Sequence, residues 1–220
     1  MFTYDDGLLL TRCRLWVDVR RRQARSFVSH AHADHMARHE LALCTHETGQ
    51  LYQARLGRRP VREMRLGEPI DFGGLRLTAL GAGHCLGSAM LLAEDGNQSL
   101  LYTGDFKLSE SLTAAPCEPR HADSLVMEST FGRPDYRLPP RSETIERLLE
   151  VVHAAFDEGR TPVIHAYALG KSQEVTKILT THGVPVLHHP RVWAMSQVYE
   201  RCGTSLSTGD ADVTVYSGRP

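Results

Sequence analysis

SHAHADHM, the stretch from Ser29 to Met36, places three histidines and one aspartate within six consecutive residues. In an extended segment, residues two apart point the same way, so His30 and His32 can present their imidazoles to one metal ion. Asp34 and His35 follow one turn later and can face a neighbouring position. Imidazole and carboxylate groups together suit zinc or a similar first-row divalent ion. The spacing therefore predicts two half-sites for metal on one loop, and a merely polar turn is the weaker interpretation.

Two further ligand candidates stand where later strands are expected to end. His84 follows an apolar run through the glycine-rich stretch LGAGHCLGS, and glycine lets the backbone approach a ligand closely. Asp105 follows the apolar run 100–102 in the same way. A single histidine or aspartate at a strand end is more often structural. The order of cluster, strand, His84, hairpin, strand and Asp105 is much more specific.

The composition is that of an ordinary globular chain, because 41% of its 220 residues are hydrophobic and 23% are charged. No stretch reaches the ~18 to 20 apolar residues that a membrane-spanning helix needs, and the N-terminus lacks the pattern of a signal peptide. The five cysteines contain no C-x-x-C pair, which argues against a disulfide framework or a structural zinc knuckle. We therefore expect a soluble cytoplasmic protein with no membrane partner.

The charges are balanced, with 25 basic and 26 acidic residues, so no global field indicates a nucleic-acid partner. Two arginine clusters nevertheless flank the histidine stretch. They are Arg20, Arg21, Arg22 and Arg25 before it, and Arg55, Arg58, Arg59, Arg62 and Arg65 after it. A solvated basic face is the simpler interpretation of each cluster, and contact with nucleic acid is the alternative.

The first half of the sequence predicts short strands joined by tight turns. Strands are expected over 26–29, 41–45, 70–72, 75–80, 90–93 and 99–103, and 46–56 has helical character. Gly73-Gly74 and Asp95-Gly96 indicate the turns of two hairpins.

After about residue 120, predicted strands and helices alternate. The strands are 125–128, 163–166, 186–187 and 213–216, and the helices are 145–156, 172–182 and 192–202. The first helix carries one apolar stripe, with Gly159 where a C-terminal cap belongs. This alternation predicts an α/β unit with a largely parallel sheet.

Three motifs, SHAHADH, AGHCLGS and YTGDF, strongly resemble those of the metallo-β-lactamase superfamily. MESTFG at 127–132 and AYALGKSQE at 166–174 are similar to its β-CASP nuclease branch. The opening WVDVRRRQARSFVSHAHADH most resembles bacterial exonucleases associated with DNA ligase, often labelled mRNA 3′-end processing factors. The resemblance covers nearly the whole chain. It implies an α/β fold with an incomplete metallo-β-lactamase αββα sandwich over residues 1–120 and a partial inserted β-CASP domain over 121–220.

The resemblance also implies a site with two zinc ions. The implied ligands are His30, His32 and His84 at one zinc, Asp34 and His35 at the other, and Asp105 as the bridge. Asp18 would order the metal loop without binding metal, and Glu128 would orient a histidine general acid. Two metals can hold a hydroxide and lower its pKa, and Asp34 could accept the proton of the attacking water.

Nucleases of this branch fold back after the inserted domain and deliver later histidines, whereas this sequence ends at Pro220. We expect a C-terminally truncated or split reading frame, a second metal site that is weaker or takes Mn²⁺, and an exposed sheet edge that invites homo-oligomers.

His165 is a candidate for lining the cleft. Gly170, Lys171 and Ser172 form the sequence G-K-S, which ends a nucleotide-binding P-loop. That motif requires glycine in place of His165, so Lys171 and Ser172 are at most contacts to a substrate phosphate.

The leading hypothesis is a zinc-dependent nuclease, specifically an exonuclease in DNA repair or RNA 3′-end processing. DNA or RNA would be the substrate, and a DNA ligase or helicase a partner by family resemblance. One alternative is a catalytically impaired nucleic-acid-binding or scaffold subunit. Another is hydrolysis of a small thioester or lactam, because a fold does not fix a function.

Overall fold

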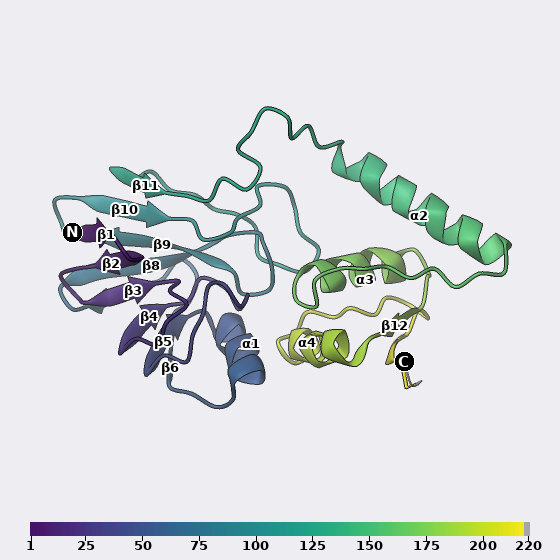
Figure 1. Cartoon of the computed structure of the whole chain (residues 1–220), viewed down its shortest axis with the longest axis horizontal. Coiled ribbons are helices and arrows are strands. Elements are labelled where there is room, and N and C mark those ends of the chain that lie inside the picture. The colour runs from purple at the N-terminus through teal and green to yellow at the C-terminus, as the bar shows by residue number, and fades with distance from the viewer. Residues whose placement is uncertain (218–220) are drawn as a thin grey trace.

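In the computed structural model, which describes residues 1–217, most strands belong to two large sheets (Figure 1). The six-stranded sheet consists, in spatial order, of β1 (Phe2–Tyr4), β2 (Leu8–Leu10), β3 (Leu15–Val17), β4 (Arg25–Phe27), β5 (Leu41–Cys44) and β6 (Val61–Glu63). The five-stranded sheet has the order β11 (Ser124–Val126), β10 (Ser99–Tyr102), β9 (Ala89–Glu94), β8 (Leu75–Gly81) and β7 (Pro69–Phe72). Both predicted hairpins, β7–β8 and β9–β10, are confirmed.

The two sheets share one apolar core. Leu15 and Phe27 from the six-stranded sheet lie in the same buried cluster as Leu77 and Ala79 from β8, and all four are fully buried. Alternate residues of β8 point the other way, because side chains along a strand alternate between its faces. Leu80 accordingly packs in a different cluster, with Phe106 and Cys117 of the segment after β10 among its members. The five-stranded sheet is therefore buried on both faces.

Helices cover the other face of the six-stranded sheet. Ala42 and Cys44 of β5 cluster with residues of α1 (His46–Leu56) and of α4 (Pro190–Arg201). The α1 range is the one that the sequence predicts. Its first turn is capped by Thr45, whose hydroxyl accepts a hydrogen bond from the Thr48 N–H at 3.2 Å. Because α4 comes from the second half of the chain, the two halves share this cluster.

The second half alternates helices and short strands. It contains α2 (Arg141–Asp157), α3 (Lys171–Thr181), β12 (Val186–His188), α4 and β13 (Val213–Val215). The last two strands pair in parallel, as expected, and form a small separate sheet. The strand predicted at 125–128 forms as β11 but pairs with β10 of the five-stranded sheet. Within the described residues, none of the helices is both long and apolar enough to cross a membrane.

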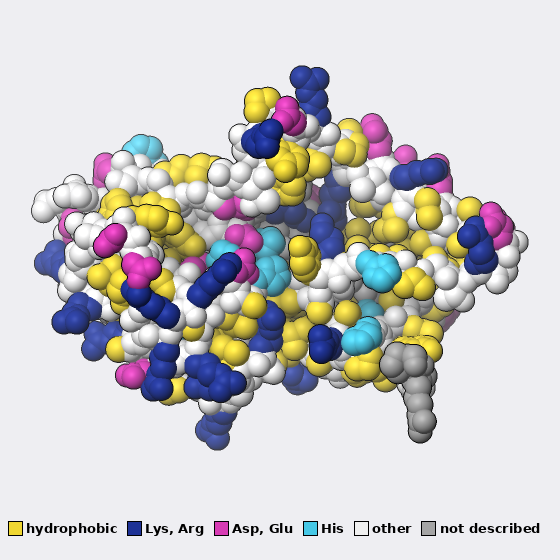
Figure 2. Space-filling model, viewed as in Figure 1, with side chains coloured by type: hydrophobic (Ala, Val, Ile, Leu, Met, Phe, Trp, Pro, Cys, Tyr) yellow, Lys and Arg dark blue, Asp and Glu magenta, His cyan; other side chains and the backbone are white. Residues whose placement is uncertain are grey.

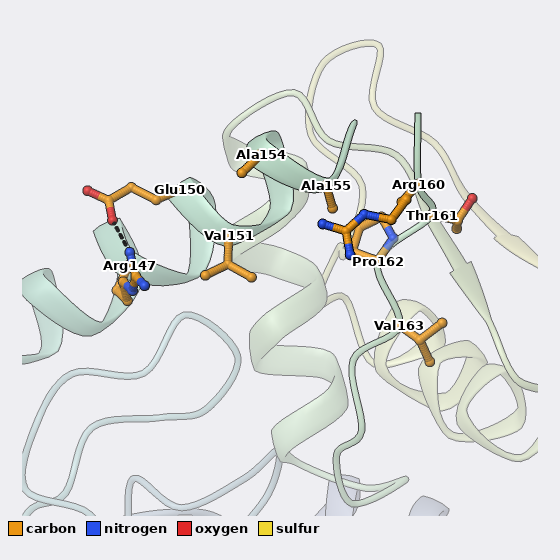
Figure 3. A pocket seen from close by; sticks show the side chains of 9 residues that line it. All are labelled: Arg147, Glu150, Val151, Ala154, Ala155, Arg160, Thr161, Pro162 and Val163. Carbon is orange, nitrogen blue, oxygen red and sulfur yellow. Dashed lines mark hydrogen bonds and ion pairs between the residues drawn. The ribbon is translucent and has the colours of Figure 1, made fainter. Parts of the chain in front are cut away.

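The strand predicted at 163–166 is wrong. Residues 160–167 have no regular secondary structure, and Val163 is 76% exposed. A strand needs a neighbour for its N–H and C=O groups, and among the described strands β12 pairs with β13 alone. Pro162 and Val163 instead line an open hollow of about 640 Å³ beside Val151 of α2 (Figure 3). This hollow lies away from every metal-ligand candidate.

His188 of β12 is buried with one nitrogen unsatisfied. Its Nε2 lies 2.7 Å from the Thr176 hydroxyl, which already donates to the Ser172 carbonyl, so Nε2 carries the proton. Nδ1 is buried without a partner. Burial lowers the pKa of His188 from 6.5 to about 4, because protonating Nδ1 would leave a buried N–H without an acceptor.

This arrangement predicts acid sensitivity. The unfolded chain binds a proton at His188 below about pH 6.5 and the folded chain only below about pH 4, so stability falls as the pH drops through that window. Urea denaturation should show a steeper loss between pH 7 and pH 4 for the wild type than for His188→Gln. Parallel pH profiles for the two proteins would contradict the assignment.

Candidate metal centre

The metal-ligand candidates meet because five strands end at the same edge of the paired sheets. Strands β3 and β4 are parallel, β10 and β11 are parallel, and β8 runs with β10 because both are antiparallel to β9. The residues that follow these strand ends are Asp18, His30 to His35, His84, Asp105 and Glu128. Figure 2 shows histidine and acidic side chains gathered together near the middle of this face of the molecule.

Four donor atoms converge at the centre of this edge. They belong to His30, His32, His84 and Asp105. His32 Nδ1 lies 2.9 Å from His30 Nε2 and 3.3 Å from His84 Nε2. Asp105 Oδ2 lies 3.7 Å from both His30 Nε2 and His84 Nε2. Donors bound to zinc at ~2.0 to 2.1 Å in a tetrahedron are ~3.3 Å apart, so the four atoms match one such ion.

The carboxylate of Asp18 determines which nitrogen of His30 is free. Its side chain is 3% exposed and accepts hydrogen bonds from the Ser29 N–H at 2.7 Å and from the Ser29 hydroxyl. Because the only hydroxyl hydrogen of Ser29 goes to Asp18, the Ser29 oxygen must accept from His30 Nδ1, 3.0 Å away. His30 Nε2 therefore carries a lone pair toward the centre of the group.

A backbone carbonyl does the same for His32. Its Nε2 lies 3.0 Å from the carbonyl oxygen of Leu169, which can only accept, so the proton is on Nε2 and Nδ1 has a lone pair. Two lone pairs, on His30 Nε2 and His32 Nδ1, thus face each other at 2.9 Å. They repel unless a cation or an extra proton lies between them. The arrangement favours a bound metal ion.

A second group lies beside the first. His35 Nδ1 donates to Asp18 at 2.8 Å, and its Nε2 lies 3.2 Å from Asp105 Oδ1 and 3.6 Å from Asp34 Oδ2. Burial alone would lower the pKa of His35, but its contacts with Asp105 and Asp18 raise that pKa to about 10. Positive charge is therefore stabilised at His35, whereas burial and the neighbouring His32 lower the pKa of His84 to about 4. Neutral imidazole is the form that binds metal.

Asp18 itself does not need to bind a metal. Its two oxygens already accept from Ser29, from His35 and from the Tyr102 hydroxyl, the last at 2.9 Å. Residue 18 has φ +49, a left-handed conformation that aspartate adopts more readily than most residues. These contacts indicate an orienting role, because second partners of this kind hold the ligands in place.

Glu128 lies at the rim of the group. Its oxygens accept from the backbone N–H groups of Phe106 and Thr130, both at 3.2 Å. With His35, Asp105 and Tyr102, it lines a cavity of about 210 Å³. The cavity is adjacent to the second group of ligand candidates.

The substrate-contact candidates lie in the second half of the chain. Ser172 donates its hydroxyl to the Tyr167 carbonyl at 2.7 Å and so stabilises the start of α3. Lys171 is the exposed first residue of α3, and His165 is exposed in the segment without regular structure. In this part of the chain, the Leu169 carbonyl contacts a ligand candidate directly, because it lies 3.0 Å from His32 Nε2. Sequence reasoning missed Leu169, Ser29 and the Tyr102 hydroxyl. Ser29 and Tyr102 gave a signal by position, because Ser29 directly precedes His30 and Tyr102 opens the motif YTGDF.

Gly104 makes a close approach that no other residue could make. A Cβ added there would lie 2.6 Å from the Ser29 hydroxyl oxygen, and φ is +54. The absence of a side chain lets the segment that carries Asp105 lie against Asp18 and Ser29.

No protein-family model matches the chain. The chain is 39% identical over 211 residues to a protein of Opitutus terrae named "Probable DNA ligase", an alignment that covers 92% of this chain and 20% of that protein. It is 32% identical over 146 residues to cleavage and polyadenylation specificity factor subunit 3 of Dictyostelium discoideum, covering 64% of this chain and 19% of the relative. Transcription termination factor FttA of Pyrococcus horikoshii is 33% identical over 135 residues, an alignment that covers 57% of this chain and 21% of that protein.

The chain belongs to the β-CASP branch of the metallo-β-lactamase superfamily. It spans about a fifth of the length of these curated relatives. A crystal structure of a protein of unknown function from Enterococcus faecalis V583 is similar in fold, with a TM-score of 0.57 at 14% identity, and the match covers 88% of this chain and 58% of that one. Metallo-β-lactamase relatives are metal-dependent, which agrees with the converging histidine and aspartate donors.

The close approach of Gly104 predicts a site-specific effect of one added methyl group. Gly104→Ala should lower the free energy of unfolding by about 3 kcal/mol or more, from left-handed strain plus overpacking. Gly96→Ala is a matched control, because φ is +90 there but nothing lies within 4 Å of the added Cβ. Gly96→Ala should lower the free energy of unfolding only by the left-handed strain, about 1 to 2 kcal/mol. Equal losses in chemical denaturation would show that the contact with Ser29 is unimportant.

Proposed function

We propose that this chain provides the metal site of a phosphodiester hydrolase that acts on nucleic acid, and that zinc is its metal. The observation that carries the proposal is the pair of lone pairs, on His30 Nε2 and His32 Nδ1, that face each other at 2.9 Å beside two further donors. A binding module for nucleic acid has no need of such an arrangement. A metal-dependent hydrolase needs neutral imidazoles and a carboxylate at one point.

Two metals would fit at this edge. His30, His32 and His84 would hold one zinc, Asp34 and His35 would hold a second ion, and Asp105, which lies near His30, His84 and His35, would serve both. Bound there, the metals would activate water and neutralise charge on the attacked phosphate. The second group offers fewer protein donors, so it binds more weakly and can take Mn²⁺ instead of zinc.

The catalytic roles within the chain follow the positions of the side chains. Asp34 is half-exposed beside the second group, where it can accept a proton from an attacking water. Glu128 faces the same cavity as His35 and Asp105. In the role that the family resemblance implies, it would orient a histidine general acid. Asp18 fixes the directions of His30 and His35.

Two cations, Arg20 and Lys171, lie near the proposed active site and suit a phosphate backbone. Arg20 lies 3.9 Å from Asp34, and Lys171 is exposed at the start of α3, the helix whose preceding loop contacts His32. We assign Lys171 to substrate phosphate, with Ser172 supporting the turn and His165 at the edge of the cleft. Arg21 and Arg22 pair with Asp6 and Glu40, so they are less available to a ligand.

The names of the relatives support two biological settings. The name "Probable DNA ligase" supports DNA repair and a link to a ligase, whereas the polyadenylation factor subunit and the termination factor support RNA 3′-end processing. We favour exonuclease action on single strands in either setting. Residues 1–120 would form the metallo-β-lactamase αββα sandwich, and residues 121–220 part of the inserted β-CASP domain.

The proposal predicts metal-dependent cleavage. Purified wild-type protein should hold at least one zinc per chain by elemental analysis and shorten end-labelled single-stranded RNA or DNA, and a chelator should abolish cleavage. His84→Ala removes one of four donors and should lower both zinc content and cleavage at least tenfold. His153→Ala, on the exposed surface of α2, should change neither.

Three outcomes would contradict the proposal in different ways. Less than one zinc per chain and no cleavage by the wild type, with Asp34→Ala binding nucleic acid as the wild type does, would indicate a non-catalytic binding or scaffold subunit. Hydrolysis of a chromogenic lactam or a thioester without cleavage of nucleic acid would indicate a small-molecule hydrolase. Cleavage that persists in the chelated protein would exclude a metal mechanism.

A further inference from the structure

The first turn of α3 and the loop before it touch the metal centre from the second half of the chain. We propose that this turn, from Leu169 to Glu174, positions the metal ligands, with Glu174 as its main anchor, so that metal affinity depends on a carboxylate that never contacts the metal. The inference rests on the metal site proposed above and extends it to a residue outside the ligand set.

One end of the turn lies against His32. The Leu169 carbonyl accepts from His32 Nε2 at 3.0 Å. The next residue, Gly170, has φ +86, and a Cβ there would lie 3.1 Å from the Cβ of Cys85 and 3.8 Å from His32 Nε2. The backbone of the turn is therefore packed against His32 and against the residue that follows His84.

The other end of the turn is anchored through Glu174. This side chain is 9% exposed and accepts from the Ser111 and Thr113 hydroxyls at 2.9 Å and from the Leu112 N–H at 3.2 Å. It also pairs with Arg141 and, at 3.5 Å, with Lys107. Burial would raise the pKa of Glu174, but Ser111 and Lys107 lower it, so the carboxylate stays charged.

Lys107 connects Glu174 to two metal ligands. It is two residues beyond Asp105, and its backbone N–H donates to the Ala82 carbonyl at 2.9 Å. A Cβ on Gly83 would lie 2.2 Å from the Lys107 carbonyl oxygen, so the two segments are in close contact. A shift of Lys107 must therefore move the segment that carries His84 as well as Asp105.

The turn thus holds both sides of one four-donor group. Leu169 fixes His32, and Glu174 fixes the segments of Asp105 and His84, while a single helical turn sets the spacing between the two anchors. Groups that orient metal ligands typically change metal affinity by about 10- to 100-fold when they are lost. Loss of the Glu174 charge also leaves Lys107 and Arg141 without their shared partner.

Zinc affinity of near-isosteric variants tests this role. In competition with a chromophoric chelator, Glu174→Gln should bind zinc about tenfold more weakly than the wild type. Glu200→Gln is the matched control, because Glu200 also anchors a loop, accepting from the Leu206 N–H at 2.7 Å, but does so within the second half. It should leave zinc affinity unchanged. Lys107→Met should weaken zinc binding too, and its effect should not add fully to that of Glu174→Gln.

The outcomes separate this inference from the proposed function. If the wild type binds no zinc, the proposed metal site is wrong. A second outcome is that the wild type binds zinc, the zinc affinity of Glu174→Gln is within twofold of the wild type, and both glutamine variants lower the melting temperature alike. Glu174 is then only a structural anchor, and the inference fails. If circular dichroism shows that Glu174→Gln does not fold, Lys107→Met decides, and unchanged zinc affinity in that variant overturns the inference.

Discussion

The centre depends on one constraint, which is that the buried Asp18 carboxylate can only accept hydrogen bonds. Ser29, His35 and Tyr102 must all donate to it, and the Ser29 hydroxyl then leaves His30 no choice of tautomer. The close packing around Asp18 places two demands on the backbone. Residue 18 adopts a left-handed conformation, and position 104 must be glycine because there is no room for a side chain. With the Leu169 carbonyl acting on His32, these contacts direct lone pairs at one point before any cation arrives. Protons and metal ions then compete for the same positions, most evidently at His35, where two carboxylates favour positive charge.

The second half of the chain is part of this arrangement. Residues of α4 complete the buried cluster on the outer face of the six-stranded sheet, and the Tyr199 hydroxyl accepts from the Leu86 N–H at 3.2 Å, two residues after His84. The turn before α3 reaches His32 directly. Loosening of the turn before α3, or loss of the Tyr199 contact with Leu86, should therefore be felt at the ligands. Stability and metal binding are coupled through packing as well as through the ligands themselves.

The sequence predicted the features that rest on local patterns. Gly73-Gly74 and Asp95-Gly96 marked two hairpins, and residues after apolar runs, such as His84 and Asp105, did come together where strands end. A three-residue run shows no clear periodicity, so strands of this length were predicted only beside other signals. The strand β4 leads into the histidine cluster and β12 lies between predicted helices, whereas β1, β2, β3 and β6 were missed. The strand expected at 163–166 failed because a strand depends on a partner, which local sequence does not reveal. Leu169 was beyond prediction since its backbone carbonyl, which any residue has, makes the contact.

Histidine tautomers measured by nitrogen-15 NMR test the central claim most directly. In zinc-loaded protein with labelled histidines, long-range proton–nitrogen correlations should place the proton of His30 and His35 on Nδ1 and that of His32 on Nε2, with the opposite nitrogens bound to metal. A proton on Nδ1 of His32, or on Nε2 of His30, would contradict the account, because the lone pairs would then not point at a common ion.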